Sequence, residues 1–266
     1  MKQRPCVLVF AGSDPGGGAG IQADNQAIAA LGAHPLTVVT VLTAQDNDRV
    51  FAVHPVEAEL VREQALPLMA KMEIAAVKIG IVGNRANAEA IAGIIVELRR
   101  RQPDLPVVLD PVLASGHGDA LAAEEAVQAL APLLALTTVV TPNLPEAVAL
   151  SHGEPDVERQ AGILLQQGCG HVLIKGGHGE GVQVANRWFA AGDGHTWTWP
   201  RLPGSFHGSG CTLASALAAQ LARGHGMRVA LDTAQAYCQR ALENAYAIAE
   251  GQSIPDRVGT KFKENV

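Results

Sequence analysis

The amino-acid sequence predicts an α/β fold in which a mostly parallel central sheet is covered by helices on both faces. The chain has 266 residues, of which 48% are hydrophobic, so it can enclose a large core. Short apolar segments alternate with longer segments of helical pattern, an order typical of parallel sheets. The apolar segments also lack polar residues at every second position, as expected for strands that are buried on both faces.

Six apolar runs rich in valine, isoleucine and leucine are predicted to form the strands. They span residues 6–11, 36–42, 76–81, 106–110, 138–141 and 171–175. The helical segments between them span residues 21–31, 58–72, 85–101, 124–134, 146–151 and 157–167. Pro67 is expected to kink or divide the second helix, because proline removes a backbone donor and clashes with the preceding turn.

The C-terminal third of the chain has a different pattern. Residues 181–190 and 195–200 flank Gly192-Asp-Gly194 and predict a β-hairpin. Two long helices are predicted over residues 211–223 and 229–250. Because the sequence contains no internal repeat and no linker, residues 1–266 are expected to form one domain, with a poorly ordered tail at 251–266.

The composition argues against several functional classes. The formal net charge is −6 and the isoelectric point about 5.8, whereas nucleic-acid-binding domains usually carry a basic face. No stretch approaches the ~20 apolar residues of a membrane span. The cysteines form no Cys-x-x-Cys pair and indicate a reducing compartment. We therefore expect a cytoplasmic protein whose partners are small molecules.

The strongest sign of a functional site is the segment His207-Gly-Ser-Gly-Cys-Thr-Leu213, which leads into an alanine-rich helix. Free backbone amides in the turn Gly208-Ser209-Gly210, together with the helix dipole, would form an anion site. At this N-terminus we expect Cys211 to have a lowered thiol pKa and to accept the proton of an attacking hydroxyl. The alternative is an ordinary glycine-rich helix start with a buried cysteine. His207 is a second candidate base, ranked below Cys211.

A second candidate site is Thr141-Pro-Asn-Leu-Pro-Glu146, which directly follows a predicted strand. Asn143 and Glu146 are spaced so that a carboxamide and a carboxylate could hold Mg²⁺ through water molecules. The same two residues match a capping box, with Asn143 as the N-cap and Glu146 at position N3. The two roles are compatible, and the sequence leaves both open.

Two further polar residues come at strand ends, where open parallel sheets bind their ligands. Lys175 precedes two glycines and could reach a phosphate, and Asp110 could help to place Mg²⁺ or its water molecules. The alternatives are a solvated lysine and an aspartate that starts a turn.

The first strand is followed by Gly12-Ser-Asp-Pro-Gly-Gly-Gly-Ala-Gly-Ile-Gln-Ala-Asp24. This segment lacks the Gly-x-Gly-x-x-Gly spacing of a dinucleotide site, because position 21 is an isoleucine, and the chain has no P-loop motif. We expect the backbone from Gly12 onward to close around a small polar substrate, with Asp24 as a hydrogen-bond partner. Gln45, after the second strand, can both donate to and accept from a heterocycle. The alternative for Gln45 is a polar strand end.

Taken in order, these segments resemble those of the ribokinase-like hydroxymethylpyrimidine and phosphomethylpyrimidine kinases of thiamine biosynthesis. Each motif is weak by itself, but the ordered set is specific and extends from residue 6 to about residue 250. The matching pieces are Ala11-Gly-Ser-Asp-Pro-Gly-Gly-Gly-Ala-Gly-Ile-Gln-Ala-Asp24, Thr43-Ala-Gln45, Val77-Lys-Ile-Gly80, Leu109-Asp-Pro-Val112, Val140-Thr-Pro-Asn-Leu-Pro-Glu146, Lys175-Gly-Gly-His178 and His207-Gly-Ser-Gly-Cys-Thr-Leu213.

The resemblance implies a ribokinase-like three-layer α/β/α sandwich that carries a C-terminal β-hairpin and forms homodimers. The implied activity is the ATP- and Mg²⁺-dependent phosphorylation of 4-amino-5-hydroxymethyl-2-methylpyrimidine and then of its monophosphate. The product would be the pyrimidine diphosphate used to make thiamine phosphate.

The resemblance also implies roles for single residues. Asp24 and Gln45 would hold the pyrimidine. The turn from Gly208 to Cys211 would form the anion hole, with Cys211 where other ribokinase-like enzymes carry a catalytic aspartate. The remaining implied contacts are with ATP and the metal ion: Lys175, Asn143 and Thr141 with the phosphates, and Glu146 and Asp110 with Mg²⁺.

The sequence departs from the family pattern at two places. After the motif that ends at Val112, many members carry a Lys-Ser-Gly segment, whereas this chain has Leu113-Ala-Ser-Gly-His-Gly-Asp119, which puts the second phosphorylation in question. Ser209 stands where many relatives have threonine and keeps the hydroxyl. The alternative functions are a pyridoxal or pyridoxine kinase and, from other classes, an NAD(P)-dependent reductase or a non-catalytic ligand-binding relative.

Overall fold

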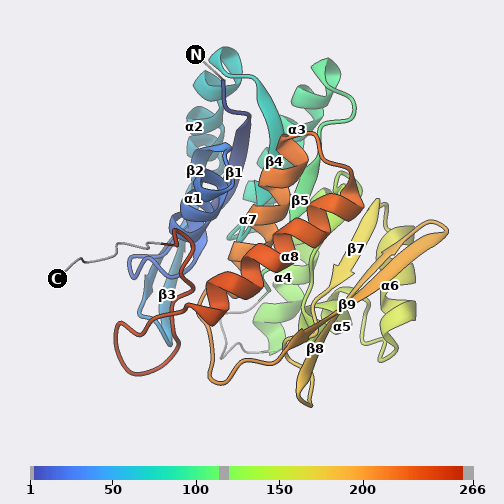
Figure 1. Cartoon of the computed structure of the whole chain (residues 1–266). Coiled ribbons are helices and arrows are strands. Elements are labelled where there is room, and N and C mark those ends of the chain that lie inside the picture. Colours follow the sequence, from blue (N-terminus) through green and yellow to red (C-terminus); the bar gives the residue numbers. More distant parts are fainter. Residues whose placement is uncertain (1–2, 114–119, 260–266) are drawn as a thin grey trace.

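A mixed β-sheet forms the centre of the protein (Figure 1). The computed structural model describes residues 3–113 and 120–259. Within these residues the strands are β1 (Cys6–Ser13), β2 (His34–Gln45), β3 (Val50–Pro55), β4 (Ile74–Ile79), β5 (Val107–Leu109), β6 (Val139–Val140), β7 (His171–Ile174), β8 (Gln183–Ala190) and β9 (Asp193–Pro200).

The strand order in the described part of the chain is β3-β2-β1-β4-β5-β6-β7-β8-β9. β1, β2 and β4 to β7 run parallel, whereas β3, β8 and β9 pair antiparallel with their neighbours. The predicted mostly parallel sheet and the C-terminal hairpin are therefore confirmed. The chain passes from β1 through β2 and β3 on one side and then crosses to β4 on the other side of β1. In open parallel sheets such a switch point marks the crevice where ligands bind.

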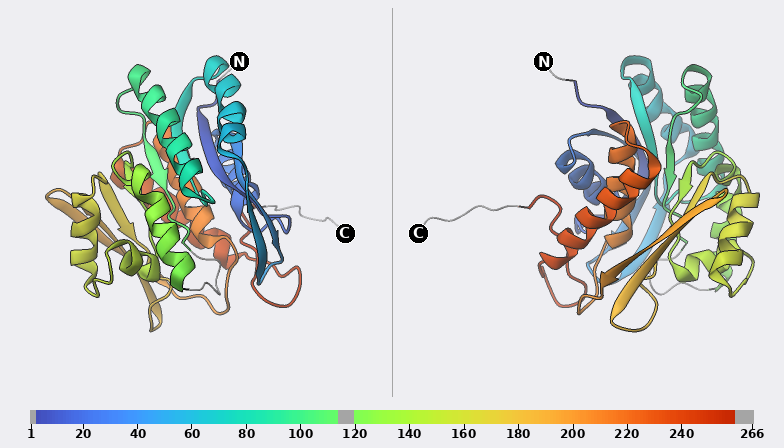
Figure 2. Two further views of the ribbon diagram at one scale, coloured as in Figure 1. Left: turned by 180° about the vertical axis from the view of Figure 1, so that it is seen from behind. Right: turned by 45° about the vertical axis from the view of Figure 1, so that its right-hand side comes forward.

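Helices cover both faces of the sheet (Figures 1 and 2), which confirms the predicted three-layer arrangement. One face carries α1, α7 and α8, and the other carries α2 to α6. The helices are α1 (Gly20–Ala30), α2 (Ala58–Lys71), α3 (Arg85–Arg101), α4 (Ala120–Leu134), α5 (Leu144–Leu150), α6 (Val157–Gln166), α7 (Ser209–Ala222) and α8 (Met227–Glu243).

Alternate residues of β1 show how the two faces bury their side chains. Leu8 and Phe10 belong to the core beneath α2 to α6, whereas Val7 and Val9 belong to the core beneath α1, α7 and α8. All four side chains are fully buried. Because both faces are covered, successive residues of the strand must all be apolar, and this accounts for the unbroken apolar run in the sequence.

Three elements differ from the sequence prediction. β3 pairs with the end of β2 at the sheet edge, where no strand was expected. Pro67 lies inside α2, which continues through it and is not divided. α8 ends at Glu243 instead of residue 250.

The C-terminal segment 251–259 packs against the domain. Ile254 and Arg257 in this segment are each 2% exposed, so the expected poor order does not hold for these residues. Residues 260–266 and residues 114–119, which include most of the segment without the family lysine, lie outside the described residues. No helix in the described ranges combines the length and apolarity needed to cross a bilayer.

Candidate active site

The polar residues singled out in the sequence gather at the carboxyl ends of the parallel strands. The glycine-rich loop follows β1, Gln45 ends β2, Asp110 follows β5, and Lys175 follows β7. The first turn of α7 reaches the same edge, since Gly210 lies against both Asp110 and Lys175. Carboxyl ends of parallel strands meet at one edge of a sheet, so residues far apart in the sequence come together there.

Gly208 determines where α7 begins. It is the N-cap of α7 and has a left-handed conformation with φ of 78°, which glycine adopts without a steric cost. A Cβ atom at this position would also collide with the carbonyl oxygen of Gly18. α7 begins at Ser209, and the amides of its first turn have no carbonyl partners within the helix. Together with the helix dipole these amides make the turn attractive to anions.

Asp110 and Lys175 form an ion pair next to this turn. Nζ of Lys175 lies 2.8 Å from Oδ1 of Asp110, and the two side chains are 14% and 3% exposed. A Cβ atom at Gly210 would lie 3.1 Å from that Nζ and 3.4 Å from Oδ2 of Asp110, so the glycine allows the ion pair to approach the helix closely. Burial lowers the pKa of Lys175, but the charges of Asp110 and Glu146 outweigh it and raise the pKa above its usual value. Lys175 therefore keeps its positive charge beside the helix N-terminus.

Thr141 supports this ion pair from within the protein. Its hydroxyl donates to Oδ1 of Asp110 at 3.3 Å, and the residue is fully buried. The contact between Thr141 and a phosphate stays a prediction, and in this structure the hydroxyl is buried. Thr141 orients the carboxylate of Asp110.

Asn143 and Glu146 form the capping box predicted for α5. Oδ1 of Asn143 accepts the Glu146 amide at 2.8 Å, and Oε2 of Glu146 accepts the Asn143 amide at 2.8 Å. Asn143 also pairs with Lys175 in an isolated parallel bridge. Burial raises the pKa of Glu146 to about 7; the positive charge of Lys175 opposes this rise and the negative charge of Asp110 adds to it. The cap thus holds a second carboxylate near the Lys175 amine.

The donor set fits a magnesium ion that arrives with phosphate oxygens. In the described residues, no group of three or more histidine, cysteine, aspartate or glutamate side chains is arranged to hold a metal ion alone. Asp110 and Glu146 nevertheless place two carboxylates around Lys175. Mg²⁺ in nucleotide sites commonly takes one or two carboxylates together with phosphate oxygens and water. The residues therefore fit a metal–nucleotide complex better than a metal bound by the protein by itself.

Cys211 lies in the first turn of α7 and is partly exposed. Burial raises the pKa of its thiol to about 11, and the negative charges of Asp24 and Asp110 add to the rise while Lys78 opposes it. The lowered pKa expected from the helix N-terminus is therefore wrong, because desolvation of a thiolate outweighs the favourable dipole. At neutral pH the thiol is protonated.

Asp24 is fully buried beneath the glycine-rich loop. Its carboxylate pairs with Nζ of Lys78 at 2.9 Å and accepts the hydroxyl of Ser215 at 2.6 Å. Burial lowers the pKa of Lys78, yet the negative charge of Asp24 more than compensates and holds the pKa above its usual value. The hydrogen bond from a substrate to Asp24 stays a prediction, and both carboxylate oxygens already have partners inside the protein. The negative charge of Asp24 is close enough to Cys211 to contribute to the raised pKa of its thiol.

The glycine-rich loop is held in shape by Asp14. Oδ1 of Asp14 accepts the Gly16 amide at 2.8 Å, and Oδ2 accepts the Ala19 amide at 2.7 Å. Oδ2 also lies 2.9 Å from Nε2 of His207, so the loop is tied to the segment before α7. These contacts give His207 a structural role and agree with its lower rank as a base.

The two remaining substrate candidates lie near the carboxyl ends of β1 and β2. Gly12 is buried, and a Cβ atom there would come 2.7 Å from Cγ2 of Ile81, so the chain requires glycine for close packing. Gln45 is half-buried at the end of β2.

Sequence reasoning assigned no role to Asp14, Lys78 or Ser215. Asp14 precedes a Pro-Gly pair, and an aspartate there often accepts amides two residues further on. Lys78 interrupts an apolar strand and is fully buried, so a buried carboxylate partner could have been inferred for it. Ser215 lies in an alanine-rich helix and gives no such signal.

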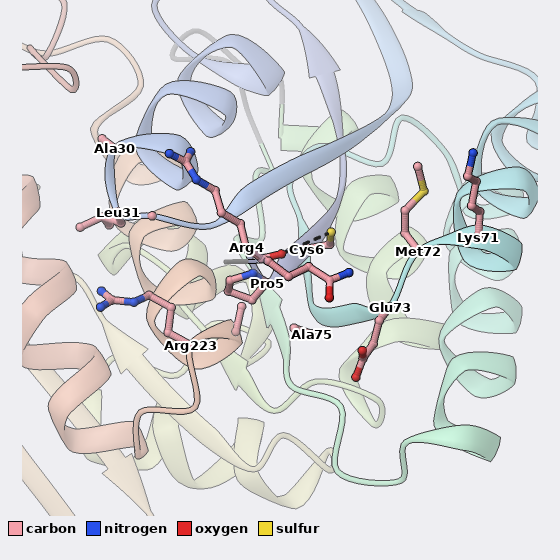
Figure 3. A pocket seen from close by; sticks show the side chains of 13 residues that line it. Arg4, Pro5, Cys6, Ala30, Leu31, Lys71, Met72, Glu73, Ala75 and Arg223 are labelled. Atoms are coloured by element: carbon pink, nitrogen blue, oxygen red, sulfur yellow. Dashed lines mark hydrogen bonds between the residues drawn. The ribbon is translucent and has the colours of Figure 1, made fainter. Parts of the chain in front are cut away.

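A surface hollow of about 1090 Å³ lies at the opposite edge of the sheet, where β1 and β4 begin. Its lining includes Arg4, Lys71 and Arg223 and none of the predicted site residues. In Figure 3 the charged ends of Arg4 and Lys71 extend toward opposite sides of the view and do not converge. Because α/β sheets bind substrates at the carboxyl ends of their strands, the region beside the start of α7 is the better candidate for the active site.

Comparison with known proteins gives a family match over most of the chain. Residues 14–256 match the family model described as phosphomethylpyrimidine kinase. The hydroxymethylpyrimidine/phosphomethylpyrimidine kinase of Rhizobium meliloti is 40% identical over 258 residues, which cover 92% of this chain and 93% of that protein.

Two solved structures show the same fold. The pyridoxal kinase of Staphylococcus aureus in complex with AMP-PCP and pyridoxal superposes with a TM-score of 0.86 at 26% identity, covering 99% of this chain and 97% of that one. The phosphomethylpyrimidine kinase of Clostridium difficile 630 superposes with a TM-score of 0.74 at 30% identity, covering 90% of this chain and 100% of that one.

Proposed function

Because the chain belongs to the phosphomethylpyrimidine kinase family, we propose that it phosphorylates 4-amino-5-hydroxymethyl-2-methylpyrimidine and then the resulting monophosphate, with ATP as the phosphoryl donor. The diphosphate formed would serve thiamine phosphate synthesis. The observation that carries the proposal is the glycine turn at the start of α7, which lies against the ion pair of Asp110 and Lys175.

This arrangement suits phosphoryl transfer. Negative charge spreads over the equatorial oxygens of the phosphoryl group as the bond to the leaving phosphate breaks. The amides of Ser209, Gly210 and Cys211 would donate to these oxygens, and the charge of Lys175 would add to the α7 dipole. These groups are fixed before the substrate arrives, so little reorganisation is needed during the reaction.

Asp110 and Glu146 would hold Mg²⁺ on the phosphate side of the crevice. When bound, the ion would neutralise charge on the β- and γ-phosphates. The hydrogen bond from Thr141 to Asp110 and the α5 cap around Glu146 would keep both carboxylates in place.

The pyrimidine would lie between the glycine-rich loop and the end of β2, near Gly12 and Gln45. Its hydroxyl oxygen would attack the γ-phosphorus from the side of Cys211, and the hydroxyl proton would pass to the thiolate form of Cys211. This form is the minor one at neutral pH, because the pKa of the thiol is raised to about 11. A loose transition state requires little proton removal before the new bond forms, so the transfer to the thiolate can come late.

The direct test supplies MgATP with the pyrimidine alcohol and, in a separate reaction, with its monophosphate. We expect ADP and the corresponding phosphorylated product in both reactions. ADP formation with the alcohol and not with the monophosphate would limit the activity to the first step, and the absence of the family lysine from residues 113–119 would then be the first explanation to test. No turnover of either pyrimidine would reject the proposal.

Pyridoxal kinase activity is the second candidate. It is favoured by the superposition on the Staphylococcus aureus pyridoxal kinase, which covers nearly the whole chain. The ratio of kcat/KM for pyridoxal to that for the pyrimidine alcohol decides between the two. A ratio well above one would assign the chain to pyridoxal phosphorylation.

The proposal also includes a homodimer in the cytoplasm. The unpaired state of Cys6, Cys169, Cys211 and Cys238 supports a reducing compartment. Sedimentation equilibrium of the purified chain would give twice the 27.7 kDa chain mass for a dimer.

A further inference from the structure

The C-terminal segment 251–259 brings a buried arginine into the candidate active site. Arg257 is 2% exposed and is among the largest fully buried side chains of the described chain. Its carbonyl oxygen accepts the hydroxyl of Tyr237 at 2.6 Å, which fixes the backbone of the segment on α8. In Figure 1 the red C-terminal segment lies at the lower edge of the molecule, beside the carboxyl ends of β1 and β2.

The segment also contacts both sides of the crevice through its backbone. The amide of His207 donates to the carbonyl of Ser253 at 2.9 Å, next to the α7 turn. The side-chain amide of Asn47, in the turn after β2, donates to the carbonyls of Glu250 and Gln252, each at 3.0 Å. Residues 250–253 therefore bridge the turn after β2 and the turn before α7.

The guanidinium of Arg257 connects the two loops that line the crevice. Nη2 donates to the carbonyl of Gly18 in the glycine-rich loop and lies 3.4 Å from the carbonyl of Gly208, the N-cap of α7. Nε donates to the hydroxyl of Thr212 at 2.8 Å, and that hydroxyl donates to the carbonyl of Gly208 at 2.8 Å. One planar group thus fixes the spacing between the loop and the turn.

The partners of this guanidinium are neutral. They are carbonyl oxygens, the Thr212 hydroxyl and the side-chain oxygen of Gln26 at 3.4 Å. Among the described residues no carboxylate forms an ion pair with Arg257. A buried cation without an ion-pair partner normally destabilises a fold. Burial lowers the pKa of Arg257, and the negative charge of Asp24 is among the charges that oppose this fall. A phosphoryl group bound at the anion-binding turn would add a further negative charge.

We propose that Arg257 is a positioning residue that fixes the anion-binding turn of α7 against the glycine-rich loop, so that the C-terminal segment is part of the active site. The proposal rests on the phosphoryl-transfer function argued above. Arg257 does not touch the reacting atoms. It orients the Gly208 carbonyl, and thereby the amides that follow it, and its charge favours an anion in front of them.

The test compares Arg257→Met and Arg257→Lys with the wild-type chain and with Arg223→Met as a control. Arg223 is an exposed arginine at the far end of α7.

We measure kcat and KM for the pyrimidine alcohol and for ATP, well below the unfolding temperature of each variant. We expect kcat of Arg257→Met to fall by about 10²-fold, because small displacements of fixed groups cost that much. Arg257→Lys should recover part of the loss through its charge, and the control should stay within about twofold of wild type.

Hydrogen exchange gives a readout that does not depend on the substrate. Arg257→Met should speed exchange at the amides of residues 208–212 and 16–20, while Arg223→Met should leave both segments unchanged. Well-folded Arg257 variants with unchanged kcat, KM and exchange would overturn the proposal. If Arg257→Met loses folding and turnover, partial recovery by Arg257→Lys would support the proposal, whereas a lysine variant with wild-type turnover and exchange would overturn it.

A variant at a hydrogen-bond partner of Arg257 keeps the test decisive if Arg257→Met does not fold. Thr212→Val removes the hydroxyl that links Nε to the Gly208 carbonyl. We expect reduced kcat in Thr212→Val and, in combination with Arg257→Lys, a loss smaller than the product of the single losses, since both variants break one network. Fully multiplicative losses would overturn the network. A wild-type chain without kinase turnover but with the expected exchange changes would reject the proposed function and leave the positioning role supported.

Discussion

Cys211 is the residue whose environment differs most from the expectation for a catalytic thiol. Burial raises its pKa to about 11. At any pH below that value, the thiolate fraction increases about tenfold when the pH is raised by one unit. If the thiolate accepts the substrate proton, kcat increases with pH between about pH 7 and pH 9. In Cys211→Ala we expect kcat to be about 10²-fold lower near pH 9 and nearly independent of pH, with ATP binding retained.

The pH profiles of the two proteins, measured at saturating substrates, check this prediction. Cys211→Ser serves as a control that keeps a polar side chain of similar size. A wild-type profile that runs parallel to that of the alanine variant would remove Cys211 from the reaction and leave it as a packing residue.

Asp24 shows how burial changes the role of a residue that the motif assigns to the substrate. Asp24→Asn leaves the ammonium group of Lys78 buried beside a neutral partner. Breaking a buried pair in this way costs about 3–5 kcal/mol, so we expect the free energy of unfolding in urea to fall by that order. The double variant Asp24→Asn/Lys78→Met should recover much of the loss. Unchanged stability together with a raised KM for the pyrimidine would instead restore a direct substrate contact.

Glu146 combines a structural and a metal-binding role, and the two can be separated. Glu146→Gln retains an oxygen that can accept the Asn143 amide, so α5 should keep its cap, but the variant loses one carboxylate charge. We expect the Mg²⁺ concentration for half-maximal velocity to rise by about tenfold. Asp156→Asn, which alters the carboxylate cap of α6, is the matched control and should not shift the Mg²⁺ titration. An unshifted titration in Glu146→Gln would limit Glu146 to capping.

At the scale of elements, the start of α7 depends on Gly208. Gly208→Ala forces a left-handed φ of 78° on a residue with a side chain and pushes its Cβ into Gly18. Gly224→Ala provides a control, because Gly224 has a φ of 82° with no atom within 4 Å of the added Cβ. We expect Gly224→Ala to lower the free energy of unfolding by about 1–2 kcal/mol from the conformation alone. Gly208→Ala should lower the free energy of unfolding by more than this and should also reduce kcat. Equal decreases in the free energy of unfolding in both variants, with an unchanged kcat, would contradict this account.

The elements that the sequence predicts well are the parallel strands of the sheet interior. They are continuous apolar runs because helices cover both faces of the sheet, so their positions can be read from those runs. β3 lies at the edge of the sheet, where Phe51 is 64% exposed, and it therefore lacks such a run. Its signal was the turn of polar residues after Gln45 followed by Val50-Phe-Ala-Val, which fits a hairpin.

The site could be located from the sequence, but its internal contacts could not. Residues that follow parallel strands meet at one edge, and this placed Asp110, Lys175 and the α7 turn together. The pairing of Asp24 with Lys78 joins residues 54 positions apart and depends on the strand order. Arg257 gave no signal, since its polar surroundings in the sequence suggested a disordered tail, whereas its partners are backbone carbonyls of distant loops.

The whole molecule contributes to one crevice, and this predicts how ligands affect stability. The crevice is built from both halves of the sheet, from α7 and from the C-terminal segment, so local opening of any of these parts dismantles it.

Ligands that bind only the folded protein stabilise it by about 2.7 kcal/mol at 100 times their Kd. For a chain of this size we expect MgATP and the pyrimidine alcohol to raise Tm by roughly 5–10 °C, in one transition that includes residues 251–259. Tm from near-ultraviolet circular dichroism, with the Trp188 and Trp197 hairpin and the Tyr237 contact to Arg257 as reporters, checks this result. A ligand that stabilises only one of two separate transitions would mean that the C-terminal segment folds independently of the crevice.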